Sequence, residues 1–156
     1  TAFLAAWVIG QFEGTLEKIV ALAVLMPIVA GMGGNAGTQV LTLMVRGLAL
    51  GQVGASNANA LVWKEARVAL MNGLLIGGTV GLATWLWFGD WQLALVIFAA
   101  LVINLLSAAI AGVLVPLTLK RMRMDPALAG GVILTTVTDV MGFFSFLGLA
   151  TLVLLR

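Results

Sequence analysis

The sequence predicts an all-α, polytopic membrane protein, and three observations carry this prediction. Of its 156 residues, 62% are hydrophobic and 9% are charged, and the mean hydropathy is +1.17. A soluble domain of this length cannot bury so much apolar surface. The charges are spaced at intervals that suit a hydrocarbon core crossed by about 20 apolar residues. Because lipid offers no hydrogen bonds to the backbone, each such interval is expected to be helical.

Five intervals with no charge, or with a single one, predict five transmembrane helices. They cover residues 1–12, 19–45, 68–89, 91–119 and 126–155. The first is too short to cross a bilayer, so it is expected to be the truncated end of a longer helix. Glycines are expected to interrupt the second span.

The basic residues predict the orientation. Six of the eight fall in one set of loops: Arg46, Lys64, Arg67, Lys120, Arg121 and Arg123. Lys18 and Arg156 fall in the opposite set. This asymmetry predicts that the first set lies on the cytoplasmic side and that the carboxy terminus lies outside. Trp85, Trp87 and Trp91 bracket the predicted outer turn, as interfacial indoles do.

The composition also excludes several classes of site. The chain has no Cys and no His, which excludes disulfides and sites built on thiolate or imidazole ligands. A metal ion held here must be a hard ion with oxygen ligands. Nucleic-acid binding is excluded because the chain has eight basic residues and no long basic run.

Gly73, Gly77 and Gly81 repeat at intervals of four in the third span. Small residues with this spacing allow a neighbouring helix to approach closely. We expect these three glycines to serve helix packing.

Asp139 is the only charge in the last predicted span. If that span begins near Gly130, the carboxylate lies about 14 Å along the helix, close to the bilayer centre. A charge there costs at least about 2.5–3.5 kcal/mol and usually has a function. No basic residue maps to that depth, so the partner is a proton, a permeating cation or water. Thr135, Thr136 and Gly142 lie about one turn away.

The second polar region is "PIVAGMGGNAGTQV", residues 27–40. Its glycines lower helix stability, and Asn35 and Thr38 are costly in contact with lipid. Two interpretations remain open: a kinked helix with its polar groups paired internally, or irregular backbone that lines an aqueous path. Asn104, in the fourth span, is expected to be structural.

Several motifs resemble the transmembrane domain of the MgtE magnesium transporter family. They are, in order, "QFEGTLEKIVAL", "GGNAGTQ", "KEAR", "DPAL" and "TTVTDVMG", and they cover essentially the whole chain. One departure is "AGGVIL", where family members often have proline; Gly130, Gly131 and Val132 are expected to change the bend at the start of the last span.

The resemblance implies a single transmembrane ion-transport domain, residues 1–156, that works as a homodimer in the cytoplasmic membrane of the cell. A pore on the dimer axis, lined by spans two and five, would allow passive Mg²⁺ entry, with Mn²⁺ and Co²⁺ as further candidate ions. Asp139 and Thr135 would bind the metal ion. The expected pore-lining residues are Asn35, Gly34, Thr38, Thr136, Thr138 and Gly142. The cytoplasmic N-domain, CBS domains and plug helix of the family, which regulate the pore, are absent from this sequence.

Two carboxylates across a dimer axis would attract a hydrated divalent cation, and acid would compete with it because close carboxylates tend to share a proton. Two alternatives stay open. The first is a proton- or Na⁺-coupled secondary transporter in which Asp139 is protonated and deprotonated during turnover. The second is a membrane scaffold that does not transport ions. Enzymatic activity is not expected, because no nucleophile–base pair is present.

Overall fold

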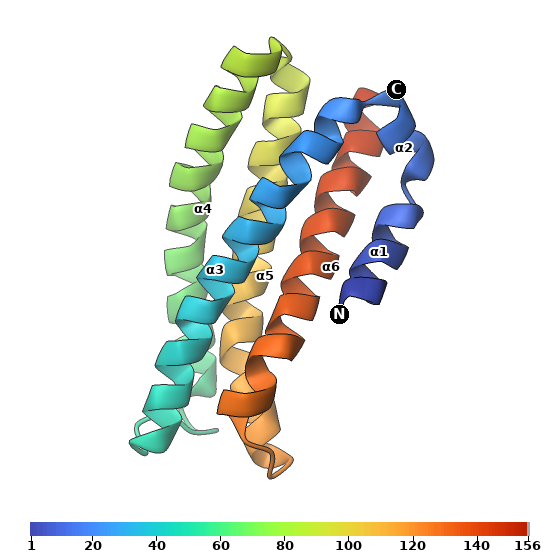
Figure 1. The fold of residues 1–156 in the computed structure, drawn as a ribbon. Coiled ribbons are helices and arrows are strands. Elements are labelled where there is room, and N and C mark those ends of the chain that lie inside the picture. Colours follow the sequence, from blue (N-terminus) through green and yellow to red (C-terminus); the bar gives the residue numbers. More distant parts are fainter. Residues whose placement is uncertain (156) are drawn as a thin grey trace.

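The computed structural model describes residues 1–155 as a bundle of helices (Figure 1). This confirms the all-α prediction. The helices in this part of the chain are α1 (Ala2–Gly10), α2 (Glu13–Lys18), α3 (Val20–Ala49), α4 (Ala58–Phe88), α5 (Trp91–Arg121) and α6 (Pro126–Leu154).

Four helices within residues 1–155 are long and apolar enough to span a membrane: α3, α4, α5 and α6. Each has 29 to 31 residues, which corresponds to about 45 Å of helix. They match the second to fifth predicted spans. The first predicted interval forms α1, whose nine residues are too short to cross. A short turn and α2 then lead into α3.

Helix α5 is the centre of the bundle and packs against α3, α4 and α6. In Figure 1, α3 and α6 lie side by side in front of α5, α4 flanks it, and α1 lies beside α6. The side chains that α5 contributes to the core include Ile97 and Leu101, both fully buried. They pack with Leu22 of α3 and Phe146 of α6 in one apolar cluster. The arrangement leaves α3 and α6 each with one face that no other helix covers.

Capping residues set the helix ends. Asp90 begins α5, where its Oδ1 accepts hydrogen bonds from the backbone N–H groups of Gln92 (2.8 Å) and Leu93 (3.2 Å). Gly89 ends α4 in the left-handed conformation, with φ +70°, a conformation that glycine adopts without steric cost. These two residues produce the tight turn between α4 and α5.

Asp125 caps α6 in the same way, by accepting a hydrogen bond from the N–H of Ala127 at 2.9 Å. Pro126 follows at the first helical position, where its missing N–H is not needed. Helix α6 therefore begins at Pro126, four residues before the start near Gly130 that was predicted from the sequence. It is helical through Gly130, Gly131 and Val132.

The prediction that glycines interrupt the second span was wrong. Helix α3 runs without a break from Val20 to Ala49, and Pro27 lies inside it. A broken helix in the membrane leaves backbone N–H and C=O groups without partners, and that cost exceeds the weak helix propensity of glycine. Gly33 and Gly37 are buried where other helices approach α3. They act as packing positions inside a regular helix.

The three glycines at intervals of four in α4 face α5. A Cβ atom at Gly73 would lie 3.2 Å from the Cα of Val102. At Gly77 and Gly81, it would lie 3.2 Å and 3.1 Å from the backbone oxygens of Phe98 and Ala94. Backbone atoms cannot move aside as a flexible side chain can, so any larger residue would push the two helices apart.

We expect Gly77→Leu to lower the free energy of unfolding by about 1–3 kcal/mol, because the new side chain overpacks the interface between α4 and α5. The matched control is Gly78→Leu, because Gly78 is exposed and has no atom near its Cβ position. Denaturant titration of the purified protein in micelles measures both variants. Equal stability of the two variants would contradict the close approach of α4 and α5.

Candidate functional site

Asn104 of α5 joins three helices in the interior. Its side chain is fully buried, and its Nδ2 donates a hydrogen bond to the backbone oxygen of Val29 in α3 at 2.9 Å. Gly33 of α3 and Gly142 of α6 lie against the amide. A Cβ atom at Gly142 would lie 2.6 Å from Nδ2, and one at Gly33 would collide with the same atom. The space for Asn104 therefore exists only because both neighbours are glycine.

Close contacts also define how α3 and α6 are aligned. A Cβ atom at Gly142 would lie 3.3 Å from Val29 Cγ1, and one at Gly37 would lie 3.1 Å from Leu134 Cδ1. Further along, Gly130 faces Leu41. From one of these contacts to the next, the position on α3 increases by the same number of residues as the position on α6 decreases. The two helices are therefore antiparallel in a constant register. This register places Asp139 level with Met32 of α3.

Small and polar residues form a stripe on the uncovered face of α3. Gly31, Asn35, Thr38 and Thr42 are all exposed and recur every three or four residues. On α6, Gly131 and Thr135 are exposed and Asp139 is partly exposed, at intervals of four. We call these seven residues the polar α3–α6 face. The register puts Gly31 and Asn35 on either side of the level of Asp139.

Asp139 lies in the middle of its helix, 13 residues after Pro126 and 15 before Leu154. The carboxylate is thus about 20 Å along α6, farther than the distance of about 14 Å predicted from a helix start near Gly130. Within residues 1–155 the structure has one ion pair, Lys64–Glu65 at 3.8 Å, on α4. Asp139 is therefore a mid-span carboxylate with no basic partner among the described residues.

The threonines of the polar α3–α6 face bond to their own helices. The hydroxyl of Thr135 donates to the backbone oxygen of Gly131, and that of Thr38 to the oxygen of Gly34, both at 2.8 Å. Each hydroxyl proton is thereby used, while the oxygen keeps lone pairs that point away from the helix. Together with the Asn35 amide and the Asp139 carboxylate, these oxygens offer acceptors to water molecules around a cation.

Two of the expected pore-lining residues lie inside the chain. Thr138 is fully buried, and its hydroxyl donates to the backbone oxygen of Thr135 at 3.1 Å. Gly142 is buried beneath Asn104. Each residue turns a helix by about 100°, so positions 138 and 142 face α3 and α5 when position 135 faces outward.

Thr136 also lies away from the polar α3–α6 face. It lines an apolar cavity of about 360 Å³ between α6 and α1, together with Leu4, Trp7 and Val140. Its hydroxyl donates to the backbone oxygen of Val132 at 2.9 Å. Gly34 is half-buried on α3 beside Thr38 and remains next to the polar face.

The structure confirms the expectation that Asn104 is structural, since it holds α5 against α3 beside the two glycines. The sequence feature that indicates this role is a single amide in the otherwise apolar fourth span, together with glycines in the second and fifth spans. Within residues 1–155, no three acidic side chains gather closely enough to surround a metal ion. A single carboxylate per chain therefore requires water molecules, or a second source of ligands, to complete a cation's coordination.

A bundle of membrane-length helices whose mid-span carboxylate has no basic partner among the described residues is typical of membrane transport proteins. Residues 26–149 match the profile of the MgtE family, described as divalent cation transporters. This chain belongs to the MgtE family.

Three curated relatives carry the name magnesium transporter MgtE. The protein of Bacillus subtilis is 32% identical over 144 residues, which cover 92% of this chain and 32% of the relative. That of Thermus thermophilus is 33% identical over 158 residues, covering 99% and 34%. That of Enterococcus faecalis is 31% identical over 147 residues, covering 94% and 32%. The chain spans about one third of the length of these relatives.

We expect Gly33→Ala to destabilise the bundle by about 1–3 kcal/mol, because the new methyl group displaces the Asn104 amide from its only partner. Gly34→Ala is the matched control: its Cβ position is open, and alanine favours a helix. Adding Asn104→Ala to Gly33→Ala should recover part of the loss. Denaturant titration in micelles tests this set, and no difference between the two glycine variants would refute the role assigned to Asn104.

Proposed function

We propose that this chain forms the ion pathway of a magnesium transporter and carries Mg²⁺ passively, in the manner of a channel, into the cell. In this proposal Asp139 binds the hydrated ion. The observation that carries the proposal is the position of this carboxylate: mid-span, partly exposed, on a polar face, and without a basic partner among the described residues.

The polar α3–α6 face supports a homodimer. A charge facing the hydrocarbon at the depth of Asp139 costs at least about 2.5–3.5 kcal/mol, so lipid is an unfavourable neighbour for this face. A second copy related by a twofold axis would cover it with an identical face. Two carboxylates, two Asn35 amides and two sets of threonine oxygens would then surround one pathway. The second copy would thereby supply the further ligands that a single carboxylate per chain lacks.

The donor set suits a hydrated magnesium ion. Mg²⁺ dehydrates reluctantly, prefers six oxygen ligands and usually keeps several waters. Threonine oxygens that already donate their protons within the helix accept hydrogen bonds from those waters. Two carboxylates supply the attraction, and contact through water keeps binding weak enough for release. The three relatives are named magnesium transporters, which favours Mg²⁺ over other hard cations.

The distribution of charge supports an orientation in the cytoplasmic membrane. One end of the bundle, where α3 and α5 end and α4 and α6 begin, carries six basic residues: Arg46, Lys64, Arg67, Lys120, Arg121 and Arg123. We call it the basic end and place it on the cytoplasmic side, with the carboxy terminus outside. Regulatory cytoplasmic domains, implied by the family resemblance, would adjoin this end in longer members.

Asp139→Ala should abolish Mg²⁺ transport, and Asp139→Asn should reduce it strongly, because both remove the charge that attracts the ion. The measurement is Mg²⁺ uptake into proteoliposomes at fixed pH, with the voltage set by a K⁺ gradient. Thr136→Val is the matched control, since it alters a polar side chain on the same helix that faces the apolar cavity beside α1.

Wild-type uptake by Asp139→Ala would disprove the role of the carboxylate. Uptake that requires a proton or Na⁺ gradient would instead identify a coupled transporter. If neither protein transports Mg²⁺ and assembly is unchanged, the scaffold hypothesis is favoured.

Cross-linking tests the dimer, and the absence of natural cysteines makes it direct. Thr135→Cys should form a disulfide-linked dimer under mild oxidation in membranes, because the proposed axis lies beside the polar α3–α6 face. Thr79→Cys on α4 is the control, an exposed membrane-span threonine with the same hydrogen bond to its own helix. Equal cross-linking at both positions, or none at Thr135→Cys, would contradict the proposed interface.

A further inference from the structure

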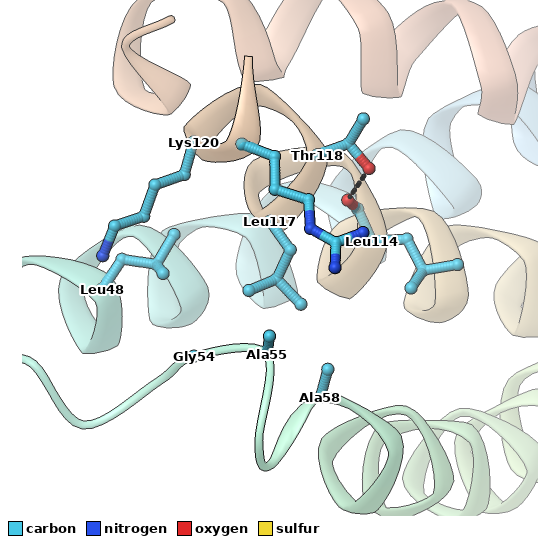
Figure 2. Close-up of a pocket in the computed structure, with 9 residues that line it drawn as sticks. Leu48, Gly54, Ala55, Ala58, Leu114, Leu117, Thr118 and Lys120 are labelled. Atoms are coloured by element: carbon cyan, nitrogen blue, oxygen red, sulfur yellow. Dashed lines mark hydrogen bonds between the residues drawn. The ribbon is translucent and has the colours of Figure 1, made fainter. Parts of the chain in front are cut away.

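A cavity of about 480 Å³ lies at the basic end of the bundle, far from Asp139. Figure 2 shows its walls: side chains from the last turns of α5 above, and the segment that joins α3 to α4 below. Lys120 and Arg121, the last two residues of α5, line it together with Ala55 and the first residue of α4, Ala58. No residue of α6 contributes to this wall.

The charged residues that line the cavity are both basic. Neither Lys120 nor Arg121 has a carboxylate within 4.0 Å among residues 1–155, where the one ion pair is Lys64–Glu65. The hydroxyl of Thr118 already donates to the backbone oxygen of Leu114 at 2.8 Å, as Figure 2 shows. The two cations are therefore available to an anion.

The start of α4 also lines this cavity. Asn57 precedes the helix, but its side chain makes no capping hydrogen bond to α4. Its Oδ1 accepts from the N–H of Gly54 and its Nδ2 donates to the oxygen of Gln52, both at 2.9 Å. The N–H groups in the first turn of α4 therefore have no side-chain cap, and the partial positive charge of this helix end adds to that of the two basic side chains around the cavity.

One wall of the cavity is apolar. Leu48, Leu114 and Leu117 line this wall, and the side chain of Leu114 in α5 is 45% exposed. The basic residues sit where the apolar span of α5 ends, the level at which lipid headgroups meet the hydrocarbon. A soluble anion would make no favourable contact with the leucines, whereas a phospholipid has both a charged headgroup and an apolar glycerol–acyl region.

We propose that this cavity binds the headgroup of an anionic phospholipid from the leaflet at the basic end. The phosphate lies between Lys120, Arg121 and the start of α4, and the upper acyl chain packs on Leu114 and Leu117. Basic cavities between membrane helices bind anionic headgroups in this manner. The site lies on different helices from the polar α3–α6 face, so it stands whether or not the chain transports Mg²⁺.

Native mass spectrometry of the purified protein tests the proposal, with phosphatidylglycerol and phosphatidylcholine of identical acyl chains as the probes. A basic residue near a headgroup contributes about fivefold to the binding of an anionic lipid. The double variant Lys120→Gln/Arg121→Gln should therefore bind phosphatidylglycerol about 20- to 30-fold more weakly than wild type, with little change for phosphatidylcholine.

The matched control is Lys64→Gln/Arg67→Gln, which removes the same charge from the same end but leaves the cavity lining intact. It should retain most of the phosphatidylglycerol affinity. A third variant, Ala55→Trp, fills the cavity without changing charge and should also weaken binding. Size-exclusion chromatography of each variant shows whether it folds, and Ala55→Trp provides a test by shape if the charge variant is unstable.

Equal losses in the two charge variants would mean general attraction to the basic end and would overturn the site. An unchanged affinity in Ala55→Trp would do the same. Inorganic phosphate is the further probe: if it displaces phosphatidylglycerol at low millimolar concentration, the cavity is a site for soluble anions and the lipid assignment fails. Retention of the lipid in that competition supports it.

Discussion

The structure depends on one constraint, that the hydrocarbon around the helices offers no hydrogen bonds. Each polar group must find a partner inside the chain or lie on a face that something other than lipid covers. The Nδ2 of Asn104 follows the first course by donating to Val29 in a space left by two glycines, while the buried Oδ1 of the same amide has no hydrogen-bond partner among the described residues. The polar α3–α6 face follows the second. Its threonines use their protons within their own helices, whereas the Asp139 carboxylate has no basic partner among the described residues, which is why we propose that a second copy covers this face.

Glycine connects this constraint to packing. In α4, glycines at intervals of four bring the helix against the backbone of α5. In α3 and α6, Gly37 and Gly130 receive Leu134 and Leu41 and hold the two helices in register. Van der Waals contact of this kind replaces the hydrophobic effect, which cannot drive helices together in lipid. The result is a close-packed pair, α3 and α6, supported from behind by α5, that holds the polar residues of both helices at defined levels around Asp139.

Charge is distributed over two separate regions with different physical roles. At mid-span the proposed pathway uses a single carboxylate per chain, where low polarity strengthens its attraction for a cation and a second copy would supply the remaining ligands. At the basic end, Lys120 and Arg121 sit where the span of α5 meets the headgroup region, beside the uncapped start of α4. The first region suits a small hydrated cation. The second suits an anion that carries an apolar tail, and the two sites share no residue.

The sequence by itself determined that the chain forms long apolar helices, because the spacing of the charges marks intervals of membrane length, but α4 begins ten residues before its predicted interval of 68–89. It also singled out Asp139, since a carboxylate in an apolar span has no inexpensive structural explanation. Only the tertiary structure decided which neighbours share its face. Thr135, Thr136 and Thr138 are the same residue type, but successive residues of a helix point about 100° apart. Thr135 is exposed, whereas Thr136 lines the apolar cavity beside α1 and Thr138 is buried in the core. The packing of α1, α3 and α5 around α6 decides these three environments. The continuity of α3 was likewise a tertiary result, because glycines that weaken an isolated helix allow close packing once neighbouring helices are present.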